Sequence, residues 1–310
     1  MPRHLVLILA LLGAGSGATA LDWALPVGVP GTAPVWDTVE LHTLPGSKEQ
    51  FTEAELHDRT RAVDWRPREH PMMPASVSSG TRGAAACGFC HLPDGAGRPE
   101  NAALAGLPAD YIREQVESFT NGERTALDGK WPPATLMAST AKVASAADVR
   151  EAADYFSRLR FATHVRVVER ARIAGAVPNN YVYALDDAKT EPIGTRIIEV
   201  PDSAERFELR DSHLGYVAYV PPGAIAAGMA LATSGGPAGQ PCALCHGTGL
   251  KGGLAPPLAG RSPSYLARQL LAFRIGRRSN AGSMPMQLIA ERLSDRDIVD
   301  LAAFAGSRRP

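Results

Sequence analysis

The sequence lacks an excess of charge of either sign, a long apolar run beyond its first residues, and any cysteine outside two short stretches. Its 310 residues include 32 lysines and arginines and 32 aspartates and glutamates. This balance gives no electrostatic reason to expect nucleic acid or an anionic membrane as a partner. No stretch after residue 20 has the apolar length that a membrane-spanning helix needs, so we expect the mature protein to be soluble.

The short apolar run at the N-terminus has the form of an export signal. Arg3 and His4 precede the apolar residues 5–12, and small residues ending in Ala18-Thr19-Ala20 follow. A basic start, a short apolar centre and an A-x-A end are typical of a cleavable secretory signal. We therefore predict that residues 1–20 are a signal peptide. An uncleaved membrane anchor is the alternative.

The four cysteines all fall within two C-x-x-C-H motifs. The motifs are Cys87-Gly88-Phe89-Cys90-His91 and Cys242-Ala243-Leu244-Cys245-His246. This pattern is typical of c-type haem attachment, in which the two thiols form thioether bonds and the histidine ligates the iron. We predict two covalently attached haem c groups, with His91 and His246 as proximal iron ligands. Since such attachment takes place outside the cytoplasm, the motifs and the export signal together predict a periplasmic protein.

Other uses of a C-x-x-C pair fit the sequence less well. A thioredoxin-like redox couple needs a βαβ context, and no parallel-sheet pattern surrounds either motif. Four cysteines could bind one zinc ion, but the ligands of structural zinc sites are usually spaced more compactly. Ordinary disulfides would not require a histidine directly after each pair.

The two motifs begin two internal repeats, residues 76–162 and residues 222–310. Leu104-Ala105-Gly106, Tyr111, Gln115, Phe119, Gly122 and Arg124 match Leu258-Ala259-Gly260, Tyr265, Gln269, Phe273, Gly276 and Arg278, each offset by 154. The apolar spacing around Tyr111 and Tyr265 predicts a helix in each repeat. A final helix begins at Ser145 and at Ser294, where a serine followed three residues later by aspartate is a helix-capping pattern. We also expect a helix over 224–232, whereas its counterpart near 76–83 should be short or absent.

The remaining segments differ from the repeats. Residues 21–75 are rich in proline and predict an irregular arm, with one short helix at Thr52-Glu53-Ala54-Glu55. Three tryptophans in the arm indicate that it packs on the folded domains, where it could shield a haem edge. Residues 163–221 contain β-type segments at 165–168, 181–183, 196–200 and 216–220, and predict a small antiparallel insert. The insert is either a spacer that fixes the two haem domains or a docking surface for a partner.

Equivalent methionines are candidate sixth ligands of the two irons. Met137 lies eight residues before Ser145, and Met286 lies eight residues before Ser294. Met284 has no methionine at the equivalent offset in the first repeat. A thioether favours the ferrous state and raises the reduction potential relative to a second histidine. We predict that Met137 and Met286 ligate iron, each from a loop laid across a haem face.

These motifs resemble those of the tandem (dihaem) class I cytochromes c of bacteria, over residues 84–160 and 222–307. The resemblance implies a mainly α fold of two class I cytochrome c domains, here with a β-rich insert and an N-terminal arm. It implies His/Met ligation and electron carriage between redox partners. In that family a proline carbonyl commonly accepts the N–H of the proximal histidine; Pro256 fits this role, whereas the first repeat has Ala102. This difference predicts two unequal haems, because such hydrogen bonds tune the ligand.

We predict a periplasmic electron carrier that is not an enzyme and has redox proteins, rather than a small-molecule substrate or nucleic acid, as partners. One alternative is a dihaem peroxidase-like oxidoreductase, which needs one iron with an open or displaceable position beside an acid–base group. The other alternative is the electron-transfer subunit of a larger dehydrogenase or oxidase, in which the arm and insert would be assembly surfaces.

Overall fold

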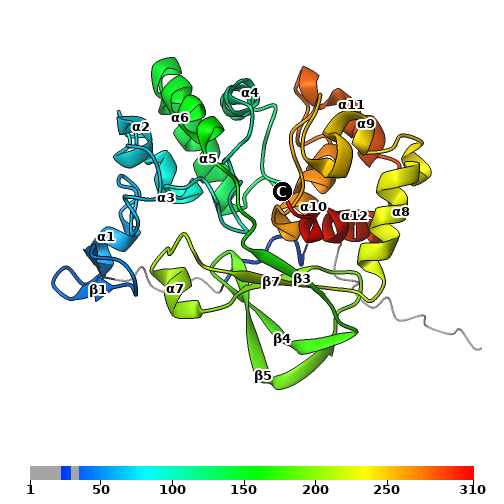
Figure 1. Ribbon diagram of the computed structural model, residues 1–310, viewed down its shortest axis with the longest axis horizontal. Helices are drawn as coiled ribbons and strands as arrows, with labels where there is room; N and C mark the ends of the chain where they lie inside the picture. The colour runs from blue at the N-terminus through cyan, green and yellow to red at the C-terminus, as the bar shows by residue number, and fades with distance from the viewer. Residues whose placement is uncertain (1–21, 29–34) are drawn as a thin grey trace, which may run out of the picture.

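The computed structural model describes residues 22–28 and 35–310, so the predicted signal peptide lies outside the described residues. Two groups of helices stand side by side above a β-rich layer (Figure 1). We call residues 76–162 the first repeat, residues 163–221 the β segment, residues 222–310 the second repeat, and the described residues before 76 the arm. No helix in the described part of the chain is long and apolar enough to cross a membrane.

The arm contains a small hairpin and one short helix. Strands β1 (Leu41–Thr43) and β2 (Gln50–Thr52) pair antiparallel, and α1 (Glu53–His57) follows directly. The Thr52 side chain accepts from the Glu55 amide, and the Glu55 side chain accepts from the Thr52 amide, so the predicted capping box is confirmed. Trp65 is buried and donates its indole N–H to the Leu209 carbonyl at 2.6 Å, which fixes the arm to the β segment.

His70 joins the arm to the first repeat. Its Nε2 lies 3.2 Å from a carboxylate oxygen of Asp64, and its Nδ1 lies 3.0 Å from the hydroxyl of Tyr155 in α6. The hydrogen bond that the Asp64 carboxylate accepts from His70 raises the pKa of His70 above its ordinary value, because the carboxylate stabilises the charged imidazolium.

The first repeat consists of five helices. They are α2 (Ala75–Ser78), α3 (Cys87–His91), α4 (Ala109–Asn121), α5 (Pro132–Val143) and α6 (Ala146–Arg158). As expected, α2 is only one turn long. Helix α4 ends at Gly122, whose φ of 76° is a left-handed conformation that glycine adopts without strain. Ser145 and Asp148 form the predicted capping box at the start of α6.

The second repeat comprises α8 (Ala224–Ser234), η1 (Gly236–Ala238), α9 (Ala243–His246), η2 (Thr248–Leu250), α10 (Pro263–Arg274), η3 (Ala281–Ser283), α11 (Met284–Ala290) and α12 (Asp295–Ser307). In this repeat, α10, α11 and α12 follow the haem motif in the same order as α4, α5 and α6 in the first repeat. The predicted helix over 224–232 is confirmed as α8. It packs closely on α12, because a Cβ at Gly228 would lie 1.9 Å from the Asp300 carbonyl oxygen. Ser294 and Asp297 form the capping box of α12.

The β segment is not purely antiparallel, contrary to the prediction. It comprises β3 (Val165–Glu169), β4 (Arg172–Asn179), β5 (Val182–Pro192), β6 (Ile198–Pro201), α7 (Ala204–Glu208) and β7 (Tyr216–Val220). Strands β4 and β5 form an antiparallel hairpin, and β6 pairs antiparallel with β7, but β3 pairs parallel with β7. The parallel pair is possible because the β4–β5 hairpin, β6 and α7 supply a long crossover between the two strands.

The β segment and the start of the arm tie the two repeats together. Glu199 of β6 is buried and accepts from Ser262 Oγ, Ser264 N and Ser264 Oγ at 2.8, 3.0 and 2.6 Å. Ala24 is fully buried among residues of the β segment and the second repeat, and its carbonyl accepts from Arg268 at 3.1 Å. The Pro26 carbonyl accepts the indole N–H of Trp131 at 3.4 Å. The arm therefore packs against folded segments, as its tryptophans indicated.

Candidate haem sites

The two C-x-x-C-H motifs form short helices that border one cavity of about 980 Å³ between the repeats. Helix α3 carries the first motif, and Cys242 is the N-cap residue of α9. The packing around α3 depends on Gly88, because a Cβ there would lie 2.8 Å from the Val77 carbonyl oxygen. All eight residues predicted to bind or ligate haem line this cavity: Cys87, Cys90, His91, Met137, Cys242, Cys245, His246 and Met286.

Each motif histidine is held in one tautomer by a backbone carbonyl. Nδ1 of His91 lies 2.8 Å from the Ala102 carbonyl, and Nδ1 of His246 lies 2.7 Å from the Pro256 carbonyl. A carbonyl can only accept, so Nδ1 carries the proton and Nε2 presents a lone pair. Nε2 of His246 is buried and has no hydrogen-bond partner, which suits a metal ligand. Burial lowers the pKa of both histidines and favours the neutral form that binds metal.

These hydrogen bonds correct the expectation that the first repeat lacks a carbonyl acceptor for its histidine. They also remove the reason given for two unequal haems. The first repeat makes the carbonyl bond with Ala102 as well as the second repeat does with Pro256, so the absence of proline does not remove it. The hydrogen bond therefore gives no reason for unequal haems.

Three of the four cysteines, Cys87, Cys90 and Cys242, are partly buried, whereas Cys245 is exposed. All four are free of disulfides. Burial raises the pKa of Cys87 to about 12 and also raises the pKa of Cys90 and Cys242. A reactive redox couple needs a lowered thiol pKa, so these values disfavour the thioredoxin-like alternative. Within 22–28 and 35–310, no three or more His, Cys, Asp or Glu side chains are grouped closely enough to hold a metal ion.

The two candidate methionines lie in helices rather than in the predicted loops. Met137 lies in α5 and Met286 in α11, and both are half-buried. The preceding prolines occupy the first turns of these helices, where the missing N–H breaks no helical hydrogen bond. Met284, the competitor of Met286, is 58% exposed and is not among the residues that line the cavity.

Four arginines line the cavity, and sequence reasoning gave none of them a role in the site. Arg124, Arg261, Arg268 and Arg278 are at most 8% exposed. None of them forms an ion pair with a carboxylate of the described residues. Each guanidinium stacks on an aromatic ring, at 4.1 to 4.7 Å from the ring centroid. Burying a cation is costly without a compensating charge, so this donor set fits an anionic group in the cavity.

Two of these arginines form a nearly symmetric network between the repeats. Arg124 donates to Gln115, Tyr265 and Gln269 at 2.9, 3.0 and 2.8 Å. Arg278 donates to Gln269, Tyr111 and Gln115 at 3.2, 3.2 and 2.7 Å. Each glutamine oxygen therefore accepts from one arginine of its own repeat and one of the other repeat.

The backbone joins the repeats at the same place. Arg124 and Arg278 form an isolated antiparallel bridge. Next to it, Thr125 N donates to the Arg277 carbonyl at 2.9 Å, and Ser279 N donates to the Glu123 carbonyl at 2.8 Å. The network is thus built on a short backbone pairing between equivalent segments of the two repeats.

Comparison with known proteins shows the family to which the chain belongs. Residues 238–304 match the family described as cytochrome c oxidase, cbb3-type, subunit III. Over 69 residues the chain is 39% identical to cytochrome c-554(548) of Halomonas halodenitrificans, covering 22% of this chain and 83% of that protein. Over 231 residues it is 26% identical to cytochrome c4 of Azotobacter vinelandii, covering 74% of this chain and 87% of that protein. The chain belongs to the dihaem class I cytochromes c and carries covalently attached haem c.

Two further similarities involve proteins named for thiosulfate dehydrogenase. The chain is 29% identical over 226 residues to the thiosulfate dehydrogenase electron acceptor of Thiomonas intermedia, covering 72% of this chain and 78% of that protein. It also aligns with the structure of thiosulfate dehydrogenase (TsdBA) from Marichromatium purpuratum, at a TM-score of 0.49 and 27% identity, covering 75% of this chain and 38% of that one.

Proposed function

We propose that the protein is a periplasmic carrier of single electrons that uses two His/Met-ligated haems. The observation that carries this proposal is one cavity lined by two equivalent sets of two cysteines, one histidine and one methionine. His91 and Met137 would ligate one iron, and His246 and Met286 the other. Bound haem c supplies reversible one-electron oxidation and reduction of its iron.

The protein's own residues would hold each haem and keep its surroundings nearly constant. The carbonyls of Ala102 and Pro256 orient the proximal histidines. Met137 and Met286 would each supply a neutral ligand in both oxidation states, so that little in the protein would rearrange during transfer. We assign the four buried arginines to the carboxylates of the haem propionates, since these are the anionic groups that a haem brings into the cavity.

We further propose that residues 76–162 and 222–310 are the two haem domains and that residues 163–221 join them. The exchange partners are redox proteins of the periplasm. The similarity to an electron acceptor of thiosulfate dehydrogenase supports a second, narrower role. In that role the protein would receive electrons from one dehydrogenase, either as a free carrier or as its subunit.

The test uses the exported protein with its haems attached. Haem content by the pyridine haemochrome assay should be two per chain, and a redox titration should be fully reversible. After reduction, carbon monoxide should leave the absorbance of both haems unchanged, because both irons keep their methionines. Binding of carbon monoxide at one haem, together with turnover of hydrogen peroxide, would refute the carrier proposal and favour the peroxidase-like alternative. A stable complex with a dehydrogenase on co-purification would support the subunit role over a free carrier.

A further inference from the structure

We propose that Arg210 of the β segment positions the haem-attachment helix of the first repeat and, through its buried positive charge, raises the reduction potential of the first haem above that of the second. This inference rests on the proposed function, because it assumes a redox-active haem at each motif. It assigns a role in one haem site to a residue that lies outside both repeats.

Arg210 contacts the middle of the first motif. It lies just after α7, in a left-handed conformation with φ of 57°. Its guanidinium carbon lies 3.7 Å from the centroid of the Phe89 ring, and its Nη2 donates to the Phe89 carbonyl. Phe89 is only 7% exposed. Arg210 therefore holds both the side chain and the backbone of α3 from outside the repeat.

The charges around Arg210 do not cancel. Arg98 and Glu100 form a buried ion pair, with Nε and Oε1 3.0 Å apart. Arg210 has no carboxylate within ion-pair distance among the described residues, and its buried Nε has no hydrogen-bond partner. Burial, together with the charge of Arg98, lowers the pKa of Arg210 to about 9, so it stays protonated at neutral pH. One buried positive charge without a carboxylate partner therefore remains beside the motif. Burial raises the pKa of the Cys90 thiol, and Arg210 is the cation that opposes this most, ahead of Arg98 and the exposed Arg59.

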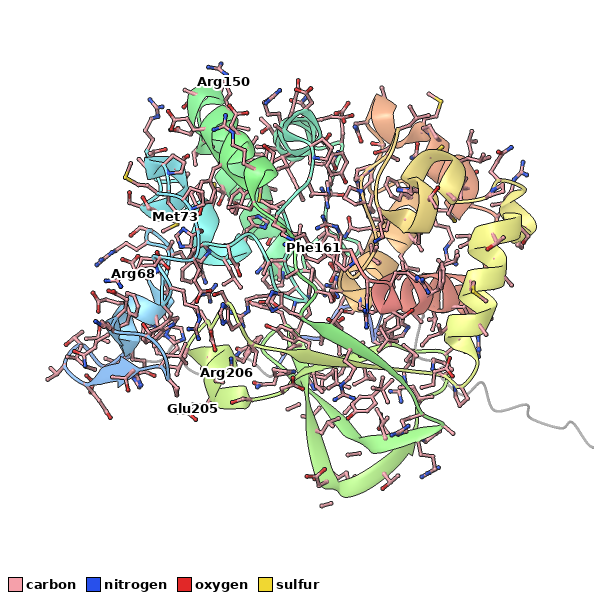
Figure 2. The ribbon with its side chains drawn as sticks, in the orientation of Figure 1. Arg68, Met73, Arg150, Phe161, Glu205 and Arg206 are labelled. Atoms are coloured by element: carbon pink, nitrogen blue, oxygen red, sulfur yellow. The ribbon has the colours of Figure 1, made fainter. Side chains whose placement is uncertain are left out.

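The segment that carries Arg210 is anchored on both sides. Asp211, whose side chain is fully buried, pairs with Arg206 of α7 at 2.5 Å and with Arg66 of the arm at 3.6 Å. Figure 2 shows Arg206 on α7, between the arm and the β strands. The neighbouring Leu209 accepts from the Trp65 indole at 2.6 Å. Because these contacts fix the backbone, Arg210 is held in place before any change of redox state occurs.

The second repeat has no equivalent of this arrangement. Leu244 occupies the place of Phe89 in the second motif and is 62% exposed. Arg98 and Glu100 lie eight and ten residues after Cys90, whereas the corresponding positions after Cys245 are Gly253 and Ala255. The second motif therefore lacks both the buried ion pair and the additional cation.

The direction of the effect follows from electrostatics. Oxidation adds one positive charge at the iron, and a nearby buried cation makes that state less stable. The ferrous state is then favoured, and the reduction potential rises. Water screens a charge near the exposed second motif more strongly than one in the enclosed first motif. Electrons shared between the two haems should consequently reside mainly on the first haem.

Potentiometric titration with optical detection tests the proposal on the holoprotein. Met137→His, which replaces a methionine ligand by histidine, should lower the potential of the first haem alone and so identify it. In the wild type the first haem must have the higher potential; if it has the lower one, the proposal is wrong, and this result needs no Arg210 variant.

The variants then separate the charge of Arg210 from its packing. Arg210→Gln should lower the potential of the first haem only, and should reduce the equilibrium preference of an electron for that haem by about tenfold, as expected for one unit charge at intermediate distance. Arg210→Lys keeps the charge and should retain most of the preference. Arg196→Gln, which removes a cation of the β segment that is paired with Glu191 and takes no part in holding Arg210, is the control and should change neither potential.

Equal shifts of both haems, or no shift in Arg210→Gln, would overturn the proposal. Loss of the preference in Arg210→Lys to the same extent as in Arg210→Gln would overturn the role of the charge. By contrast, fewer than two haems per chain or an irreversible titration of the wild type would contradict the proposed function itself.

Discussion

The network of Arg124 and Arg278 makes a quantitative prediction about the contact between the repeats. Either arginine alone can still donate to both Gln115 and Gln269, because each glutamine oxygen accepts from both guanidinium groups. Removal of one arginine therefore leaves no glutamine oxygen without a donor. It also removes one of two buried like charges: burial and, to a smaller extent, the charge of Arg124 lower the pKa of Arg278. Removal of both arginines leaves both glutamine oxygens unpaired.

The magnitudes follow from the number of bonds. Arg124→Met and Arg278→Met each remove three hydrogen bonds from a charged donor, offset by relief of a buried charge, and each should cost about 1–3 kcal/mol of the free energy of unfolding. The double variant should lose more than the sum, by about 1–3 kcal/mol, because Gln115 is then a buried acceptor without a partner.

Urea unfolding of the oxidised holoprotein, followed by circular dichroism, measures all four corners of this double-mutant cycle. Arg113→Met, at a partly exposed arginine of α4, is a control that should be additive with either variant. If the costs of Arg124→Met and Arg278→Met add to within about 0.5 kcal/mol, the two arginines are not coupled through shared acceptors, and the reasoning fails.

Three further predictions concern single sites. Met137→Ala and Met286→Ala should each allow carbon monoxide to bind one reduced haem, whereas the Met284→Ala protein should bind no carbon monoxide. Binding of carbon monoxide to the Met284→Ala protein would contradict the ligand assignment. Because the pKa of His70 is raised in the folded protein, its ion pair with Asp64 stabilises the fold below the unfolded pKa, and this stabilisation is lost as pH rises through the folded pKa. His70→Gln should therefore flatten the decrease of the urea midpoint as pH rises above 6.5, the ordinary pKa of histidine. An unchanged slope would contradict this prediction. Gly228→Ala should lower the unfolding midpoint strongly, because the added methyl group would meet a backbone carbonyl of α12 at 1.9 Å; an unchanged midpoint would contradict such close packing.

Local sequence patterns predicted the parts of the fold that depend on neighbouring residues. The capping boxes at Thr52, Ser145 and Ser294 were recognisable because each is formed by side chains three residues apart. The strand β4 was missed, because its alanines and glycine have low β-propensity and its pairing with β5 determines its conformation. The parallel pairing of β3 with β7 is a long-range property that neither strand's sequence contains.

The acceptor of the hydrogen bond from the proximal histidine cannot be recognised by its residue type. Sequence reasoning sought a proline, but the acceptor is a backbone carbonyl, which every residue has. The path of the loop brings the Ala102 carbonyl to His91, and that path requires Gly97, where φ is 67° and a Cβ would lie 2.5 Å from the Ala102 oxygen.

The sequence pattern singles out only two of the four buried arginines. Arg124 and Arg278 stood out as a repeated pair, although the pattern did not reveal that each reaches across to the other repeat. Arg261 and Arg268 have no such counterpart, since the residues 154 positions earlier are Leu107 and Glu114. Only the three-dimensional structure shows that all four converge on one cavity.

The described segment nearest the N-terminus, residues 22–28, has a consequence for the order of folding. The carbonyl of Ala24 accepts from Arg268, 244 residues later in the chain, and that of Trp23 accepts from the Tyr183 hydroxyl, 160 residues later. These partners emerge during synthesis long after the segment itself. Its residues are therefore made well before their partners and are among the last to become fixed, because closing such large loops requires the later elements to be in place. Protection of this segment from a protease would thus report that the whole chain has folded.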